Sequence, residues 1–343
     1  MKKILYVTTA ILLLALTPSV AKAKTANASK TMTTTINGTE FSYQFHGNSK
    51  QKVDIIKVSN VDETLIFPAK LDGYTVHGIG GNHYDTSLQW DETGKKVKKV
   101  IIKKGIKKIG YEAFEGNRIP DGSNIEAVFI PQSVKRIGPS AFSNNAKIEK
   151  VAICNQDTKI ECYAFSECKN LKKINLPKGE FTGKIEEGAF YGCDLRSLRL
   201  PYMKKQKQIG RFAFAENENL KKITFSKKYT KIRIGKDWFT DCSKAQITIG
   251  KNVKAFSSEI NANAGTVRLL GKKTKLLGFR KPGASPYYYI QYETFIVPKG
   301  AKALKVLKKA KYGKVNDGKE ERYSADGNNY FGYDMKKVKV VIE

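Results

Sequence analysis

The sequence predicts a β-rich solenoid with a parallel sheet on one face, short strands or turns on the other, and a cap at each end. A unit recurs in steps of 28, 23, 25, 24 and 25 residues between the phenylalanines that close it. Each unit contains a short run of alternating apolar and polar residues, the pattern of a strand with one buried face. A unit this short buries its apolar side only against its neighbours, so the copies stack. The closing residues are Phe114, Phe142, Phe165, Phe190, Phe214 and Phe239.

Residues 1–23 have the three-part pattern of a secretory signal peptide. Two lysines precede the apolar run 4–16, and the small residues at 21–23 form a cleavage site, with a second one at 26–28. A membrane anchor needs about 18 or more apolar residues, and this run has 13. We therefore expect an extracellular protein without stable membrane insertion, either released or held non-covalently at the cell wall.

The segments ahead of the repeats are predicted to be a tether and a cap. Residues 24–35 are rich in threonine, alanine and lysine and have little to bury, so we expect a flexible tether. Residues 36–94 alternate in polarity at 40–45, 53–58 and 64–68. These three runs predict strands of an N-terminal β cap.

The repeats are expected to run from 95 to 278. In the unit that contains 171–176, an apolar–polar alternation gives one strand, and Pro177 then ends the hydrogen-bonded ladder. A second apolar position follows, with glycine after it in most units and glutamate after it at Ile160 and Ile185. Alanine and phenylalanine then close the turn, where a small residue beside a large one fits a tight corner.

This pattern resembles the BspA-like type of leucine-rich repeat, found in bacterial surface and secreted proteins. The resemblance covers roughly half of the chain in about seven units, and 65–80 resembles the family's entry into its first repeat. It implies a leucine-rich-repeat solenoid that binds a ligand or a surface, without enzyme chemistry. The chain departs from the pattern at Trp238-Phe239, where other units have alanine and phenylalanine.

Residues 279–343 are predicted to form a C-terminal cap. We expect a strand at 295–298 and a short basic helix at 303–309. A turn at 326–329 does not have the spacing of an EF-hand calcium loop. A tyrosine cluster either covers the open end of the solenoid or stacks on sugar rings as a secondary binding site. The cluster consists of Tyr287, Tyr288, Tyr289 and Tyr292.

Three of the five cysteines share one repeat position. Cys168, Cys193 and Cys242 each follow a closing phenylalanine by three residues. A single cysteine per turn is most simply a small buried filler. A disulfide between Cys168 and Cys193 is the alternative, since neighbouring turns stack.

The sequence gives no support for a metal site or a catalytic site. His77 and His83 could be combined with Asp85, but no third ligand has diagnostic spacing, so loop or structural histidines are favoured. We find no nucleophile elbow, no phosphate-binding loop and no dinucleotide fingerprint. The chain is accordingly predicted to be neither an enzyme nor a cofactor-binding protein.

The chain is strongly basic, with a formal net charge of +30. Removal of three lysines with the signal peptide leaves 30 − 3 = +27. Such a field attracts polyanions, and outside a bacterium these include wall phosphate polymers, acidic glycans and, non-specifically, nucleic acid. The alternative is a diffuse coat of solvated lysines without a particular partner.

Strand alternation predicts the candidate binding surface. Neighbouring strands lie about 4.8 Å apart, so Lys150 beside Lys173 brings like charges together, which is unfavourable unless an anion lies between them. We expect this outward sheet face to bind an anionic polymer, a glycan or a protein. The candidate residues are Lys99, Phe129, Lys150, Lys173, Asn175, Arg199, Lys222 and Thr224.

The sequence thus favours a secreted or surface-associated bacterial binding or adhesion protein. A structural wall-associated protein, retained by its basic charge without a specific ligand, is the alternative. Salt separates the two, because binding by charge alone weakens smoothly with ionic strength.

Overall fold

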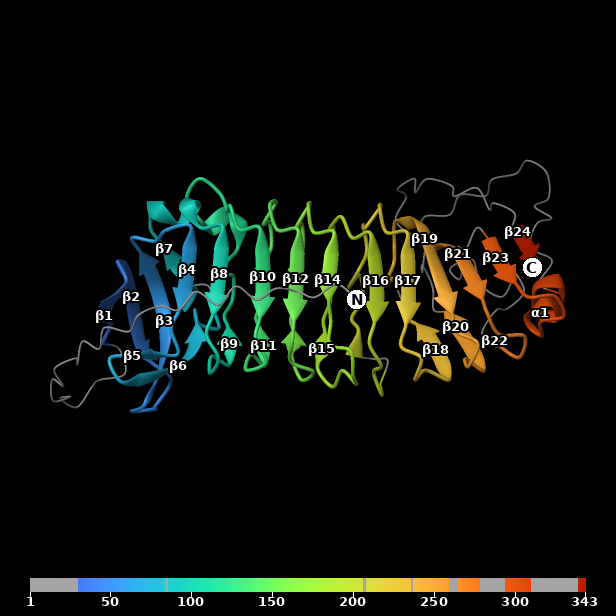
Figure 1. Cartoon of the computed structure of the whole chain (residues 1–343), viewed down its shortest axis with the longest axis horizontal. Coiled ribbons are helices and arrows are strands. Elements are labelled where there is room, and N and C mark those ends of the chain that lie inside the picture. Colours follow the sequence, from blue (N-terminus) through green and yellow to red (C-terminus); the bar gives the residue numbers. More distant parts are fainter. Residues whose placement is uncertain are drawn as a thin grey trace, which may run out of the picture.

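The computed structural model describes residues 30–83, 86–205, 208–235, 237–258, 264–277, 294–309 and 339–343. They form an elongated stack of turns in which strands from successive repeats lie side by side along the long axis (Figure 1). The predicted solenoid, with parallel sheets and little helix, is confirmed.

The main sheet has eleven strands, and each pairs in parallel with its neighbours. Its apolar side chains alternate inward, as at Val100 and Val128, which are almost fully buried. In spatial order the strands are β4 (Thr64–Phe67), β8 (Lys99–Ile102), β10 (Ala127–Ile130), β12 (Lys150–Ile153), β14 (Lys173–Asn175), β16 (Ser197–Leu200), β17 (Lys222–Phe225), β19 (Cys242–Ile249), β21 (Ala264–Leu269), β23 (Thr294–Val297) and β24 (Lys339–Ile342).

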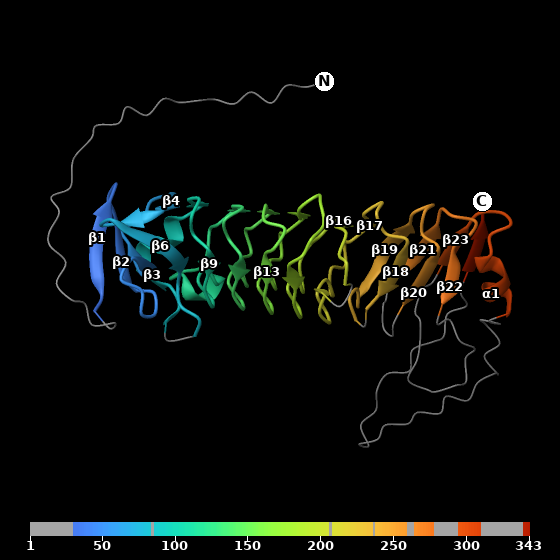
Figure 2. The same ribbon diagram turned by 90° about the horizontal axis from the view of Figure 1, so that it is seen from below.

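A second layer of strands, which are two residues long at β9, β11, β13 and β15, covers the other side of the core (Figure 2). A ten-stranded sheet contains β1 (Met32–Ile36), β2 (Thr39–Phe45), β3 (Lys52–Ser59), β5 (Lys70–Leu71), β6 (Tyr74–Ile79), β7 (Gln89–Trp90), β9 (Lys108–Ile109), β11 (Arg136–Ile137), β13 (Lys159–Ile160) and β15 (Lys184–Ile185). A three-stranded sheet contains β18 (Lys231–Ile234), β20 (Ala255–Ser258) and β22 (Lys275–Leu277). The helical elements are η2 (Glu92–Lys96), η3 (Gly116–Arg118) and α1 (Ala303–Lys309).

The closing phenylalanines stack through the middle of the core. All six are fully buried, and the rings from Phe114 to Phe214 lie within 3° of parallel. Their centroid separation grows along the chain from 4.9 Å at Phe114–Phe142 to 5.9 Å at Phe214–Phe239. Alanine precedes phenylalanine in five of these turns and leaves room for the stack.

In five of these turns, the position three residues after phenylalanine holds a buried cysteine or asparagine that donates a hydrogen bond. The five residues are Asn145, Cys168, Cys193, Asn217 and Cys242, whereas Asn117, at the first such position, is exposed. The cysteine thiols donate to the carbonyls of Phe142, Phe165 and Phe214, at 3.2, 3.1 and 3.3 Å from Cys168, Cys193 and Cys242. Asn217 Nδ2 donates to Phe190 and Phe214, both at 2.9 Å, and Asn145 Nδ2 donates to Phe114 and Phe142 at 2.6 and 2.8 Å. These cysteines are free thiols in the structure, and they hold adjacent turns together as well as filling space.

The N-terminal cap begins earlier than the sequence analysis placed it. β1 starts at Met32, inside the predicted tether 24–35, because the β-branched threonines 33–35 pair antiparallel with β2. Asn37 and Gly38, both with positive φ, join the two strands in the tight turn that such a hairpin prefers. The strands predicted at 40–45, 53–58 and 64–68 are confirmed as β2, β3 and β4.

The C-terminal elements continue the main sheet. The strand and short helix predicted at 295–298 and 303–309 are confirmed as β23 and α1. β23 pairs in parallel with β21 on one side and with β24 on the other, so the sheet extends past residue 278. The predicted signal peptide, Tyr287, Tyr288, Tyr289, Tyr292 and the turn at 326–329 lie outside the described residues.

The second layer is interrupted where the sequence departs from its pattern. In the described residues, the ten-stranded sheet ends with a single bridge between Ile185 and Ile209, and pairing resumes in the three-stranded sheet at β18. Trp238 lies against Gly235 there, so that a Cβ on Gly235 would come 2.3 Å from the indole Nε1. A hollow of about 670 Å³ opens beside it. The tryptophan therefore fills part of the space between the separated turns.

Candidate functional site

The outward side of the main sheet, here called the main face, presents two columns of side chains. The strand register places the first column at Lys99, Ala127, Lys150, Lys173, Ser197, Lys222 and Gln246. The second column, two residues further along each strand, contains Ile101, Phe129, Ala152, Asn175, Arg199, Thr224 and Thr248.

All eight sequence-predicted binding residues lie on the main face. Lys99, Lys150, Lys173 and Lys222 belong to the first column, whereas Phe129, Asn175, Arg199 and Thr224 belong to the second. Thr224 is half-buried and the other seven are exposed. Among the lysines of the first column, only Lys150 and Lys173 are direct neighbours, because Ala127 and Ser197 interrupt the column on either side.

These cations have no internal counter-ion. In the described part of the chain, no acidic oxygen lies within 4.0 Å of Lys99, Lys150, Lys173, Arg199 or Lys222. The lysines just before β8 and β14 differ from them: Lys98 pairs with Glu63 at 2.6 Å, and Lys172 pairs with Glu149 at 3.1 Å. On these two strands, the lysine in the first column is therefore unpaired although the lysine before it is paired.

Part of the second column is apolar, and Phe129 is its one apolar member among the sequence-predicted candidates. Phe129 is 58% exposed and Ile66, at the sheet edge on β4, is 39% exposed. Ile101 lies between them in the register and Ala152 follows Phe129, both half-buried. The same alternation rule would have placed Ile66 outward had β4 been assigned to this sheet.

The outward side of β9, β11, β13 and β15, here called the second face, also carries stacked cations. Lys108, Arg136, Lys159 and Lys184 are neighbours in register. Here, however, glutamates occupy the position where other turns have glycine. Glu161 forms an ion pair with Arg136 at 2.8 Å and accepts a hydrogen bond from Lys159 at 2.7 Å, and Glu186 lies 2.9 Å from Lys184 and 3.3 Å from Lys159.

This arrangement explains why glutamate replaces glycine after Ile160 and Ile185. Burial opposes ionisation of Glu186, but the hydrogen bond from Lys184 and the charge of Lys159 outweigh it and lower the pKa of Glu186 below its ordinary value. Glu161 is almost fully buried between Arg136 and Lys159. The second face thus neutralises the adjacent lysines Lys159 and Lys184 with its own carboxylates.

The repeats match the family model of the BspA type leucine-rich repeat region in six copies, over residues 92–203 and 135–267. Together these matches span about half of the 343 residues. The chain belongs to this family. The predicted resemblance is confirmed, and both faces described above are built by BspA-type repeats.

The comparison with solved structures finds leucine-rich repeat proteins of low sequence identity. One from Bacteroides ovatus has 20% identity, with 78% of this chain and 66% of that chain covered and a TM-score of 0.41. One from T. pallidum has 18% identity, with 65% and 87% covered and a TM-score of 0.43. The pneumococcal vaccine antigen PcpA has 14% identity, with 81% and 96% covered and a TM-score of 0.30. No curated protein matches the chain in sequence.

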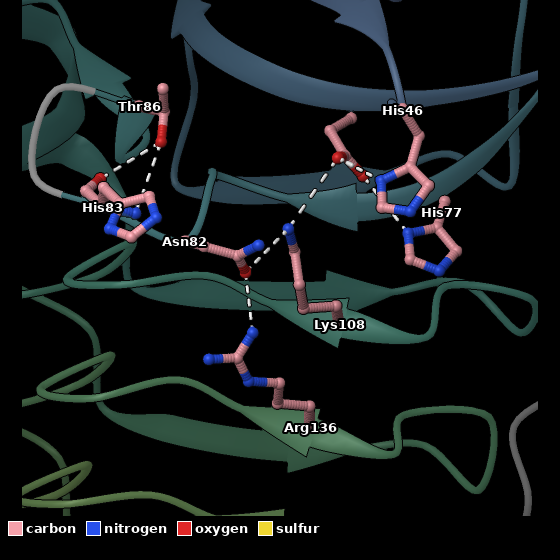
Figure 3. A network of polar contacts seen from close by, with 8 residues as sticks. His46, His77, Asn82, His83, Thr86, Lys108 and Arg136 are labelled. Carbon is pink, nitrogen blue, oxygen red and sulfur yellow. Dashed lines mark hydrogen bonds and ion pairs between the residues drawn. The ribbon is translucent and has the colours of Figure 1, made fainter. Parts of the chain in front are cut away.

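The histidines are arranged differently from the pairing considered in the sequence. His77 lies beside His46, not His83, with ring centroids 3.8 Å apart (Figure 3). Asp54 joins them: its carboxylate oxygens lie 2.7 Å from His46 Nδ1 and 3.3 Å from His77 Nδ1. Sequence reasoning missed this cluster because its members come from three strands or their ends, brought together by pairing of the cap with the first BspA-type repeats.

These three groups are the donor types that bind transition metals, but their surroundings are cationic. Lys108 Nζ lies 3.7 Å from Asp54 Oδ2 and would repel a divalent ion held by that carboxylate. Among the described residues, no helix is long and apolar enough to cross a membrane.

Proposed function

We propose that this protein is a secreted or surface-associated bacterial binding protein whose main face engages an anionic polymer or glycan. The observation that carries the proposal is the unpaired pair Lys150 and Lys173. Two ammonium groups directly opposite each other on adjacent strands destabilise a sheet. An external anion between them would remove that repulsion.

The second face supports this interpretation. The same repeats place Lys159 beside Lys184 in register and supply Glu186 within 3.3 Å of both. BspA-type turns can therefore accommodate a counter-ion for stacked lysines. Its absence from the first column, among the described residues, favours a surface that receives its negative charge from a partner.

The apolar part of the second column would add contacts beside the charges. Phe129 stands one strand from Lys150, in the neighbouring column. An exposed aromatic ring stacks on the apolar face of a sugar ring, while adjacent ammonium groups bind sulfate, phosphate or carboxylate. An anionic glycan matches both kinds of contact. Binding, not catalysis, is the role proposed for this face.

The second candidate is a structural wall-associated protein held by charge alone, favoured by the formal net charge of +30. Export rests on the signal-like segment 1–23, and in either case we place the protein outside the cell. The two candidate functions differ in whether binding depends on particular side chains or only on the total positive charge.

The test is binding of the chain without residues 1–23 to an array of anionic glycans and wall polymers at physiological salt. A specific surface predicts binding to a subset of polymers and its loss in Lys150→Gln/Lys173→Gln. Equal binding to every polyanion, with the double variant indistinguishable from the parent, would favour the structural role.

A further inference from the structure

A second hollow lies where the N-terminal cap meets the first repeats, away from the main face. Its volume is about 490 Å³. Two histidines, Asn82 and four cations line this hollow, here called the cap pocket. Figure 3 shows both histidines, Asn82, Lys108 and Arg136. The cations are Lys107, Lys108, Lys135 and Arg136.

Strand register builds the cap pocket. Asp54 on β3, Gly78 on β6, Lys108 on β9 and Arg136 on β11 are successive neighbours across the sheet. A Cβ on Gly78 would come 2.6 Å from Asp54 Oδ1 and 2.9 Å from Lys108 Cε. The missing side chain therefore lets Lys108 lean across toward Asp54.

Lys108 is poorly satisfied for a buried charge. Its side chain is 7% exposed, and its ammonium reaches only Asp54 at 3.7 Å and Asn82 Oδ1 at 3.4 Å. Burial lowers the pKa of Lys108, with Asp54 acting against burial. An ammonium has three donors, and two long contacts leave it able to bind a stronger acceptor.

The remaining cations surround this buried group. Arg136 donates to Asn82 Oδ1 at 2.6 Å and forms an ion pair with Glu161 at 2.8 Å, and both contacts hold its guanidinium beside Lys108. Lys107 and Lys135 are exposed on the adjacent position of the same two turns, where the Lys135 N–H donates to the Lys107 carbonyl. The residues that line the pocket include four cations and no carboxylate, so the charge of the lining is positive.

We propose that the cap pocket binds a tetrahedral oxyanion, the sulfate or phosphate group of a larger molecule. Lys108 and Arg136 form its floor, and Lys107 and Lys135 its rim. Charge-assisted hydrogen bonds to such an oxyanion are about twice as strong as neutral ones. This site is separate from the main face and does not depend on the function proposed for it.

The histidines can report on binding in the cap pocket, because the chain has only three of them and their signals can be followed individually. His46 and His77 line the cap pocket and His83 does not. In the chain without residues 1–23, labelled at histidine, NMR titrations with sodium sulfate and with sodium phosphate at constant ionic strength and neutral pH follow all three imidazoles. We expect saturable shifts of His46 and His77, with His83 unchanged. The oxyanion that saturates at the lower concentration identifies the ester class.

A variant pair separates this site from the main face. Lys107→Ala/Lys135→Ala removes only exposed rim side chains, so it should fold, and we expect it to weaken oxyanion binding about tenfold or more. Lys150→Ala/Lys173→Ala is the matched control and should leave the titration unchanged. Equal, non-saturating shifts of all three histidines would overturn the proposal. So would saturation by Zn²⁺ with no response to either oxyanion.

Discussion

The main face and the second face are built by the same repeats and carry stacked cations in the same way, yet only one of them is neutralised. On the second face, Lys159 and Lys184 share Glu186. On the main face, Lys150 and Lys173 are equally close in register and have no acidic partner among the described residues. A high lysine count therefore does not distinguish the two faces, whereas the pairing of each lysine does.

The comparison also distinguishes cations that are paired within the fold from cations whose charge can still attract a partner. Neutralised cations on the second face contribute to the stability of the turns, and they attract a partner weakly because their field is cancelled nearby. Unpaired cations on the main face slightly destabilise the sheet and retain their field for an incoming anion. Each prediction below tests one side of this contrast.

The largest effect is expected in the core that holds both faces in place. Asn217→Ala removes a buried amide that donates to the carbonyls of Phe190 and Phe214, leaving them without this donor. We expect a loss of about 3 kcal/mol in the free energy of unfolding, measured by denaturant titration. Asn217→Cys restores the donor used in adjacent turns and should lose about half as much. Equal losses in the two variants would contradict the proposed equivalence of cysteine and asparagine.

The next effect tests the two faces directly by matched neutralisation. Lys150→Gln/Lys173→Gln should lower affinity for heparin, used as a polyanionic probe, about tenfold without lowering stability. Lys159→Gln/Lys184→Gln should lower the free energy of unfolding by about 1 kcal/mol and leave affinity unchanged. Calorimetric binding and denaturant unfolding measure the two quantities. The contrast fails if both double variants change the same quantity.

A smaller effect is the pH dependence of the second face. The pKa of Glu186 is lowered below 4.5 by Lys184 and Lys159, although burial acts against them. A carboxylate with a lowered pKa stabilises the fold above its unfolded value and loses this contribution as pH falls through its folded value. The stability difference between the parent and Glu186→Gln should therefore be constant above pH 4.5 and shrink below it.

The matched control for this pH series is Glu149→Gln, which removes an exposed partner of Lys172 beside the main face. Because both side chains of that pair are about half exposed, its removal should change stability little at any pH. A Glu186→Gln difference that persists unchanged in acid would mean that the carboxylate is not paired.

The smallest effect concerns thiol reactivity. Cys154 is exposed and should react first with a thiol reagent, whereas Cys168 and Cys242, whose pKa values burial raises to about 12, should react only after unfolding. Burial and then Glu186 raise the pKa of Cys162. Glu186→Gln should therefore modestly accelerate labelling of Cys162, followed by mass spectrometry, and leave Cys154 unchanged.

Much of the fold and of the main face could be predicted from the sequence, because each turn places the same kinds of side chain in the core and on the surface. Period-two alternation placed Lys150, Phe129 and Lys173 outward, and the closing phenylalanines located the core stack. The equivalence of Asn217 with Cys193 was also present in the spacing, three residues after phenylalanine, but only cysteine was followed at that position.

The contacts that sequence reasoning missed depend on register between turns. Glu161 and Glu186 were noticed as exceptions to glycine, but their role requires knowing that Lys159 and Lys184 stack beside them. The group of His46, Asp54 and His77 depends on a β-bulge in the pairing of β3 with β6. A bulge shifts which residues meet, and spacing along the chain does not reveal it.

The most direct test of the contrast is lysine acylation footprinting by mass spectrometry, with and without heparin at physiological salt. Binding through the main face predicts strong protection of Lys150 and Lys173, with the reactivity of Lys159 and Lys184 unchanged. Equal protection on both faces, or protection confined to Lys159 and Lys184, would contradict the claim that Lys150 and Lys173, unlike Lys159 and Lys184, offer their charge to a partner.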